Sequence, residues 1–182
     1  MTGRTWTISN LLSISRIILV IPIVLLLLGK SETDRWWAAG IMVVTVLTDI
    51  FDGILARRLN QVTDLGKILD PLSDKIGIAI VLVVLMIQGF IPLWFLFTVF
   101  LQDILILSGG TYAKKQKNII LQSNLFGKLT VVAIAAYILF TTVGLSQLKS
   151  IETVLRYVSV LMIIASFAVY ARRFYRVLRE EH

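Results

Sequence analysis

Four aspartates within a short stretch form the part of the sequence best suited to chemistry. Asp49 and Asp52 are three residues apart, and Asp70 and Asp74 are four apart. Residues with these spacings share one face of an α-helix. The polar segment 58–64 between the two pairs predicts a turn. The stretch is therefore expected to form a helical hairpin with its four carboxylates converging near one end.

Four carboxylates that lie close together need cations between them to offset their mutual repulsion. Like charges that face one another repel, and carboxylates at membrane depth are costly and usually functional. Hard cations with oxygen ligands, Mg²⁺ above all, suit a site built from carboxylate oxygens. The sequence therefore predicts a site for Mg²⁺ or Mn²⁺ at the hairpin.

Bulk composition indicates the elements that must position this hairpin. The chain has 182 residues, of which 57% are hydrophobic and only 16% charged, against roughly 25% charged in soluble domains. No charged residue occurs from 76 to 102, which exceeds the roughly 20 apolar residues that cross a bilayer. The absence of cysteine excludes disulfides and thiolate chemistry. We predict an all-α integral membrane protein forming a single domain over 1–182.

The apolar runs divide the chain into six predicted transmembrane helices. A short interfacial helix is expected within 1–10, and a charged helical continuation over 172–181. A polar loop is expected over 147–152. The predicted spans are 11–28, 36–56, 66–89, 92–112, 125–145 and 154–170.

The distribution of basic residues predicts the orientation. Six spans place both termini on one side, and basic residues gather on the cytoplasmic side of membrane proteins. The net charge of +7 is therefore explained by membrane topology and contact with anionic lipids, and does not indicate nucleic-acid binding. The hairpin turn lies on the basic side. We expect a multi-pass protein of the cell (inner) membrane whose site faces the cytoplasm.

The hairpin also carries a recognisable motif. It reads Asp-x2-Asp-Gly-x2-Ala-Arg-x8-Gly-x3-Asp-x3-Asp over residues 49–74. This pattern resembles the signature of the CDP-alcohol phosphatidyltransferase family, and the six-span layout extends the resemblance across most of the chain. A pattern of this length is far more specific than a lone glycine motif.

The resemblance implies an activity and a set of roles. Members of the family move the phosphatidyl group of CDP-diacylglycerol to an alcohol and release CMP. Asp49, Asp52 and Asp70 would bind one or, as we expect, two divalent metals, with Asp74 at the metal's edge. Asp74 would also be the general base toward the acceptor hydroxyl. The residues implied to bind CDP are Gly53, Ala56, Arg57, Gly66 and, from a first-span element of relatives, Asn10, Ser13 and Arg16.

Elementary chemistry agrees with these implied roles. Displacement at a pyrophosphate, with CMP as the leaving group, needs charge neutralisation, which metals and Arg57 can supply. Glycines at 53 and 66 remove Cβ atoms where a nucleotide or phosphate approaches the backbone. An in-line displacement is our preferred mechanism, and a two-step path stays open.

The sequence gives weaker evidence on the identity of the acceptor alcohol than on the donor. An acceptor that carries a phosphate favours basic contacts, for which the candidates are Lys128, Lys114 and Lys115. Lys128 resembles a Gly-Lys element of phosphatidylglycerophosphate synthases, whereas Asp103 replaces their Arg-Glu pair and resembles the acidic residue of cardiolipin synthases. Lys114 and Lys115 equally suit topology or anionic-lipid contact, and Asp103 equally suits orienting a neighbouring basic residue.

We place glycerol 3-phosphate first as the acceptor. Phosphatidylglycerol, as in cardiolipin synthases, is the alternative, followed by inositol phosphate and serine. A metal-ion transporter and a non-catalytic scaffold are the rival classes. A transporter favours acidic residues at mid-membrane and an internal repeat, and the sequence has neither pattern. The resemblance also implies a homodimer.

Overall fold

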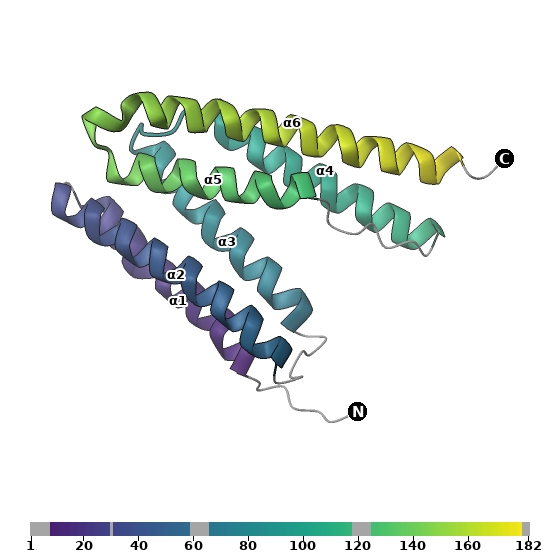
Figure 1. Ribbon diagram of the computed structural model, residues 1–182, viewed down its shortest axis with the longest axis horizontal. Helices are drawn as coiled ribbons and strands as arrows, with labels where there is room; N and C mark the ends of the chain where they lie inside the picture. Colours follow the sequence, from purple (N-terminus) through teal and green to yellow (C-terminus); the bar gives the residue numbers. More distant parts are fainter. Residues whose placement is uncertain (1–7, 30, 59–65, 118–124, 180–182) are drawn as a thin grey trace. The chain divides into compact units, whose positions relative to one another are not determined.

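The computed structural model describes the backbone of residues 8–29, 31–58, 66–117 and 125–179. Side chains are described for 15–29, 31–49, 73–109, 111 and 125–175. The described residues form six α-helices, one short 3-10 helix and no strand (Figure 1). These elements are α1 Ile8–Leu28, α2 Glu32–Arg58, α3 Gly66–Ile87, α4 Leu93–Lys117, α5 Leu125–Val143, η1 Ser146–Leu148 and α6 Lys149–Arg179.

The predicted all-α class and the order of six helices are confirmed over the described residues. The largest difference is the start of the last helix. The loop predicted over 147–152 is wrong, because η1 is followed directly by α6 from Lys149. Glu152 lies in the first turn of α6, where a negative charge favours the positive end of the helix dipole. The expected interfacial helix within 1–10 falls largely outside the described residues.

The chain divides into two compact units. The first contains the residues up to Phe90 together with Thr142–Gly144, and the second contains Ile91–Thr141 and the residues from Leu145 onward. The expectation of a single domain over 1–182 stays a prediction.

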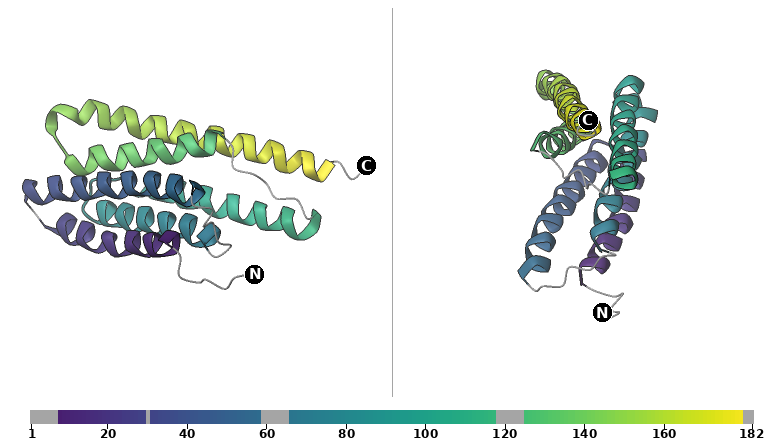
Figure 2. Two further views of the ribbon diagram at one scale, coloured as in Figure 1. Left: turned by 60° about the horizontal axis from the view of Figure 1, so that its bottom comes forward. Right: turned by 90° about the vertical axis from the view of Figure 1, so that its right-hand side faces the viewer.

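Helix α1 is central to the first unit, because it packs against both α2 and α3 (Figure 2). Its buried positions follow a helical stripe, with Val20, Ile23 and Leu27 all less than a tenth exposed. Gly77 of α3 allows a close approach, since a Cβ there would lie 3.3 Å from the Val20 side chain. Small residues at such points let helices pack closely in membranes. The Gln88 side chain also donates a hydrogen bond to the Leu27 carbonyl.

Arg35 ties the connection that follows α5 to the first unit. Its Nε donates a hydrogen bond of 2.8 Å to the Thr142 carbonyl oxygen, and its guanidinium lies 4.2 Å from the centre of the Phe90 ring. Gly144 lies against the same guanidinium with a φ of +63°. The positive φ favours glycine at this position, and a Cβ there would displace the Arg35 guanidinium.

In the second unit, aromatic and polar contacts join α4, α5 and α6. The rings of Phe95 and Tyr137 lie edge to face with centroids 4.8 Å apart. The Tyr170 hydroxyl donates to the Ile106 carbonyl over 3.1 Å, which links α6 to α4. The Thr130 hydroxyl lies 3.0 Å from the Met162 carbonyl, which links α5 to α6. These bonds satisfy side-chain hydroxyls inside an apolar bundle, where an unpaired polar group is costly.

Several helices carry outward apolar surface suited to lipid. Ile18, Ile21 and Leu25 of α1 are each more than half exposed, although large hydrophobic residues normally avoid water. Two helical stretches among the described residues are long and apolar enough to cross a membrane, Leu125–Val143 and Ser146–Tyr175. Shorter apolar stretches occupy Ser15–Leu28 and Leu93–Gly109. The six helices are thus present, and two of them clearly meet the length and composition of a span.

Replacing Gly144 by alanine is expected to destabilise the protein by about 1–3 kcal/mol, since a positive φ strains any Cβ and the new methyl group displaces Arg35. Gly40→Ala is the matched control. Gly40 lies inside α2 and a Cβ there meets nothing within 4 Å. Thermal unfolding of the purified variants in detergent measures the difference. A Gly144→Ala protein as stable as Gly40→Ala would contradict the proposed contact.

Candidate active site

Three charged residues lie at the same depth in the three helices of the first unit. Arg16 follows the start of α1 at Ile8 by eight positions, and Asp74 follows the start of α3 at Gly66 by eight. Asp49 precedes the end of α2 at Arg58 by nine. At about 1.5 Å of rise per residue, each lies about 12–14 Å from that end of its helix. Neighbouring helices that alternate in direction therefore bring the three residues to one level.

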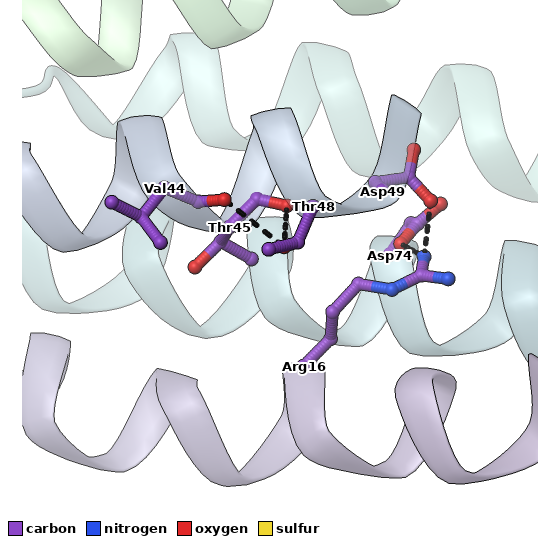
Figure 3. Close-up of polar contacts among 6 residues, drawn as sticks. All are labelled: Arg16, Val44, Thr45, Thr48, Asp49 and Asp74. Atoms are coloured by element: carbon purple, nitrogen blue, oxygen red, sulfur yellow. Dashed lines mark hydrogen bonds and ion pairs between the residues drawn. The ribbon is translucent and has the colours of Figure 1, made fainter. Parts of the chain in front are cut away.

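The side chain of Arg16 joins the two aspartates (Figure 3). Its Nη1 atom lies 2.8 Å from Oδ1 of Asp49. The same Nη1 atom donates a hydrogen bond to Oδ1 of Asp74. Because α1 packs against both α2 and α3, a long side chain from α1 can reach carboxylates on both helices at once.

Arg16 belongs to the buried stripe of α1. It precedes Val20 by four positions and Ile23 by seven, so the three residues share one helix face. Its side chain is 7% exposed, whereas the side chains of Asp49 and Asp74 are 45% and 40% exposed. The cation thus lies on the inner side of the cluster and the two anions lie toward the outside.

The turn of α2 before Asp49 is polar but internally satisfied. The Thr48 hydroxyl donates to the carbonyls of Val44 and Thr45, at 3.0 and 2.8 Å (Figure 3). The Thr45 hydroxyl donates to the Ile41 carbonyl at 2.8 Å. Bonds of this kind keep a threonine compatible with a helix interior, so Asp49 continues the helix without a break.

Asp49 and Asp74 supply two carboxylates of the kind that bind divalent metals. Asp49 and Asp74, from different helices, each place an Oδ1 atom against the same Nη1 atom of Arg16, and both side chains are partly exposed. Carboxylate oxygens are ligands that Mg²⁺ and Mn²⁺ prefer. Asp52 lies one helical turn after Asp49 in α2, and Asp70 one turn before Asp74 in α3. The side chains of Asp52 and Asp70 lie outside the described set, and among the described side chains there is no group of three metal-binding residues.

The residues predicted to bind CDP are placed at the level of the backbone. Helix α2 runs without interruption through Gly53, Ala56 and Arg57, and α3 begins at Gly66. Asn10 and Ser13 lie in the first turns of α1. The side chains of these residues fall outside the described set, so their roles stay predictions.

The residues predicted to bind the acceptor all belong to the second unit. Lys128 lies in the first turn of α5 and is exposed, and Asp103 lies in α4 and is half-buried. Lys114 and Lys115 lie in the last turns of α4, and their side chains are outside the described set. The predicted acceptor site therefore stays a prediction.

The ionic contacts of Arg16 are the feature that sequence reasoning missed. Arg16 was predicted as a CDP ligand from a short first-span pattern, and that role stays untested. The missing signal was electrostatic, because an arginine within an apolar helix face needs a buried partner. The aspartates of the motif are the carboxylates expected at the same depth as Arg16.

Known proteins resemble the chain along most of its length. It matches the CDP-alcohol phosphatidyltransferase family over residues 6–174. It is 30% identical to a CDP-diacylglycerol–glycerol-3-phosphate 3-phosphatidyltransferase of Aquifex aeolicus, over 96% of this chain and 99% of the relative. The protein of the same name from Mycoplasma pneumoniae is 26% identical, over 98% and 93%. A cardiolipin synthase (CMP-forming) of Streptomyces coelicolor is 39% identical, over 51% of this chain and 45% of the relative.

The family match covers far more than half of the chain and includes the aspartate motif and the three helices that carry it. The family predicted from residues 49–74 is thereby confirmed. This chain belongs to the CDP-alcohol phosphatidyltransferase family.

Proposed function

We propose that this protein transfers the phosphatidyl group of CDP-diacylglycerol to glycerol 3-phosphate, with release of CMP. The observation that carries the proposal is the contact of Arg16 with both the first and the last aspartate of the motif, Asp49 and Asp74, which brings carboxylates from two helices together. Family membership supplies the class of reaction. The near end-to-end match to two relatives named for glycerol 3-phosphate favours this acceptor.

Asp49, Asp52, Asp70 and Asp74 would hold one or two Mg²⁺ or Mn²⁺ ions. When bound, such ions neutralise charge that develops on the pyrophosphate. Asp74 would accept the proton of the attacking hydroxyl, for which a base must lie within hydrogen-bond reach. A new bond forms between the acceptor oxygen and the phosphorus that carries diacylglycerol. The bond from that phosphorus to CMP breaks, and CMP leaves with the bridging oxygen.

The remaining motif residues would bind the nucleotide part of the donor. Gly53 and Gly66 have no Cβ and so allow phosphate or ribose to approach the helix backbone. Arg57 would contact phosphate oxygens, for which a guanidinium is well suited. Ala56, Asn10 and Ser13 would line the same pocket. Arg16, in contrast, contacts Asp49 and Asp74.

The chain would lie in the membrane with six spans and both termini in the cytoplasm. The apolar outer surface of the described helices supports membrane insertion, which is a property of the family. The excess of basic residues beside the hairpin supports a cytoplasmic site. The diacylglycerol tails can then remain in lipid while the headgroup reaches Asp49 and Asp74. The protein would act as a homodimer in which each subunit is a single domain.

A cardiolipin synthase is the second candidate. The match to the Streptomyces coelicolor cardiolipin synthase has higher identity, although it spans about half of either chain. Asp103 in α4 is also acidic, as the resemblance to cardiolipin synthases implies. The acceptor would then be the terminal hydroxyl of phosphatidylglycerol, which carries its phosphate within a second lipid.

An acceptor panel distinguishes the two candidates. Purified protein with CDP-diacylglycerol and Mg²⁺ or Mn²⁺ is expected to release CMP with glycerol 3-phosphate and not with phosphatidylglycerol, inositol phosphate or serine. Chelation of the metal should stop the release, since the metal neutralises the charge that develops on the phosphate of the leaving CMP. CMP and the lipid product are measured by chromatography. CMP release only with phosphatidylglycerol would establish the second candidate. If none of the acceptors supports CMP release, both candidates are refuted.

Replacing Asp74 by asparagine is expected to lower turnover by about 10²–10⁴-fold, the usual contribution of a general base. Binding of CDP-diacylglycerol should be largely retained, because asparagine keeps the size and one oxygen of aspartate. Asp34→Asn is the matched control. Asp34 lies in the first turn of α2, fifteen residues before Asp49 and so about 22 Å away along the helix. Near-normal turnover in Asp74→Asn would remove Asp74 from the role of base.

A further inference from the structure

The positive charge of Arg16 could bind a substrate phosphate or act on the neighbouring aspartates, and its position distinguishes these two roles. A residue that binds a substrate phosphate presents its N–H groups toward the opening where the substrate enters. Arg16 is instead the most buried of the three charged residues, at 7% side-chain exposure, against 45% for Asp49 and 40% for Asp74. Its Nη1 atom already contacts both carboxylates. The arrangement favours action through the aspartates.

The physical effect of this contact is to fix the spacing of two like charges. Asp49 and Asp74 lie on different helices, and their carboxylates repel when both are ionised. A guanidinium between them replaces that repulsion with two charge-assisted contacts, which are stronger than neutral hydrogen bonds. Because both contacts end on one nitrogen atom, they hold the two Oδ1 atoms close to a single point.

Because Arg16 is buried, the arginine positions the aspartates, and not the reverse. Burying a charge is costly unless it is paired, so the buried guanidinium retains the carboxylates more firmly than an exposed one would. Val20 and Ile23 on the same stripe anchor α1 against its neighbours. The backbone position of Arg16 is therefore set by packing, and its side chain transmits that position to Asp49 and Asp74.

We infer that Arg16 is a positioning residue that prepares Asp49 and Asp74 to bind the catalytic metal, and that it does not bind the nucleotide. The inference rests on the proposed metal-dependent function. Groups that hydrogen-bond to metal ligands orient them and raise their affinity for the ion, and removal of such a group typically costs about 10–100-fold in metal affinity.

Direct binding of Mn²⁺ tests the inference without turnover. Purified wild-type protein, Arg16→Gln and Arg16→Lys are titrated with Mn²⁺ in the absence of substrate, and free Mn²⁺ is followed by electron paramagnetic resonance. Arg16→Gln is expected to raise the Kd for Mn²⁺ by about 10–100-fold. Arg16→Lys should raise it by a smaller factor, because an ammonium keeps the charge but has a shorter reach and one nitrogen.

Arg35→Gln is the matched control, since it removes another arginine of the first unit. Arg35 contacts Thr142 and Phe90 and lies near the start of α2, away from Asp49. Its Kd for Mn²⁺ should equal the wild-type value, which separates positioning from a general loss of stability. If Arg16→Gln does not fold, the comparison of Arg16→Lys with Arg35→Gln carries the same test.

CMP binding at saturating Mn²⁺ distinguishes the two roles of Arg16. A positioning residue leaves the affinity for CMP near the wild-type value once the metal site is filled. Weaker CMP binding with an unchanged Kd for Mn²⁺ would overturn the inference and make Arg16 a nucleotide ligand. Equal or tighter Mn²⁺ binding by Arg16→Gln would also overturn it. Failure of the wild-type protein to bind Mn²⁺ would instead refute the proposed metal-dependent function itself.

Discussion

The pairing of one buried arginine with two aspartates is the constraint on which the first unit depends. A charge inside an apolar bundle is tolerated when it is paired, and Arg16 finds both partners on the helices that flank α1. The pairing requires the three charged residues to lie at one depth. A shift of α2 along its axis would break the contact of Arg16 with Asp49, and a shift of α3 would break the contact with Asp74.

The sequence predicts the elements of this site better than their contacts. The spacing of Asp49, Asp52, Asp70 and Asp74 depends on residues close together in the chain, and α2 and α3 run through these positions as expected. The contact of Arg16 with Asp74 joins residues 58 positions apart. Local periodicity carries no information about such a pair. The depth of a residue in the membrane does carry such information, because a lone arginine on an apolar helix face implies an acidic partner at the same depth.

Helix ends show a second limit of sequence reasoning. Apolar runs locate the parts of helices that can lie in lipid, but α6 extends from Lys149 to Arg179, beyond the apolar part at both ends. Hydrogen bonds within the helix continue into water without an apolar face. Gly144 directly follows α5, the position where a glycine with positive φ commonly ends a helix, whereas its contact with the Arg35 guanidinium joins residues far apart in the sequence and is not visible there.

The acceptor is harder to predict than the donor for a chemical reason. A metal and a pyrophosphate require several groups at fixed spacing, and such spacing is written in a motif. A phosphate on the acceptor requires only positive charge, which Lys114, Lys115 or Lys128 could supply from many positions. These lysines also serve topology, so their presence carries little information. The aspartate motif is expected to serve the same donor whichever acceptor follows, so it does not distinguish glycerol 3-phosphate from phosphatidylglycerol.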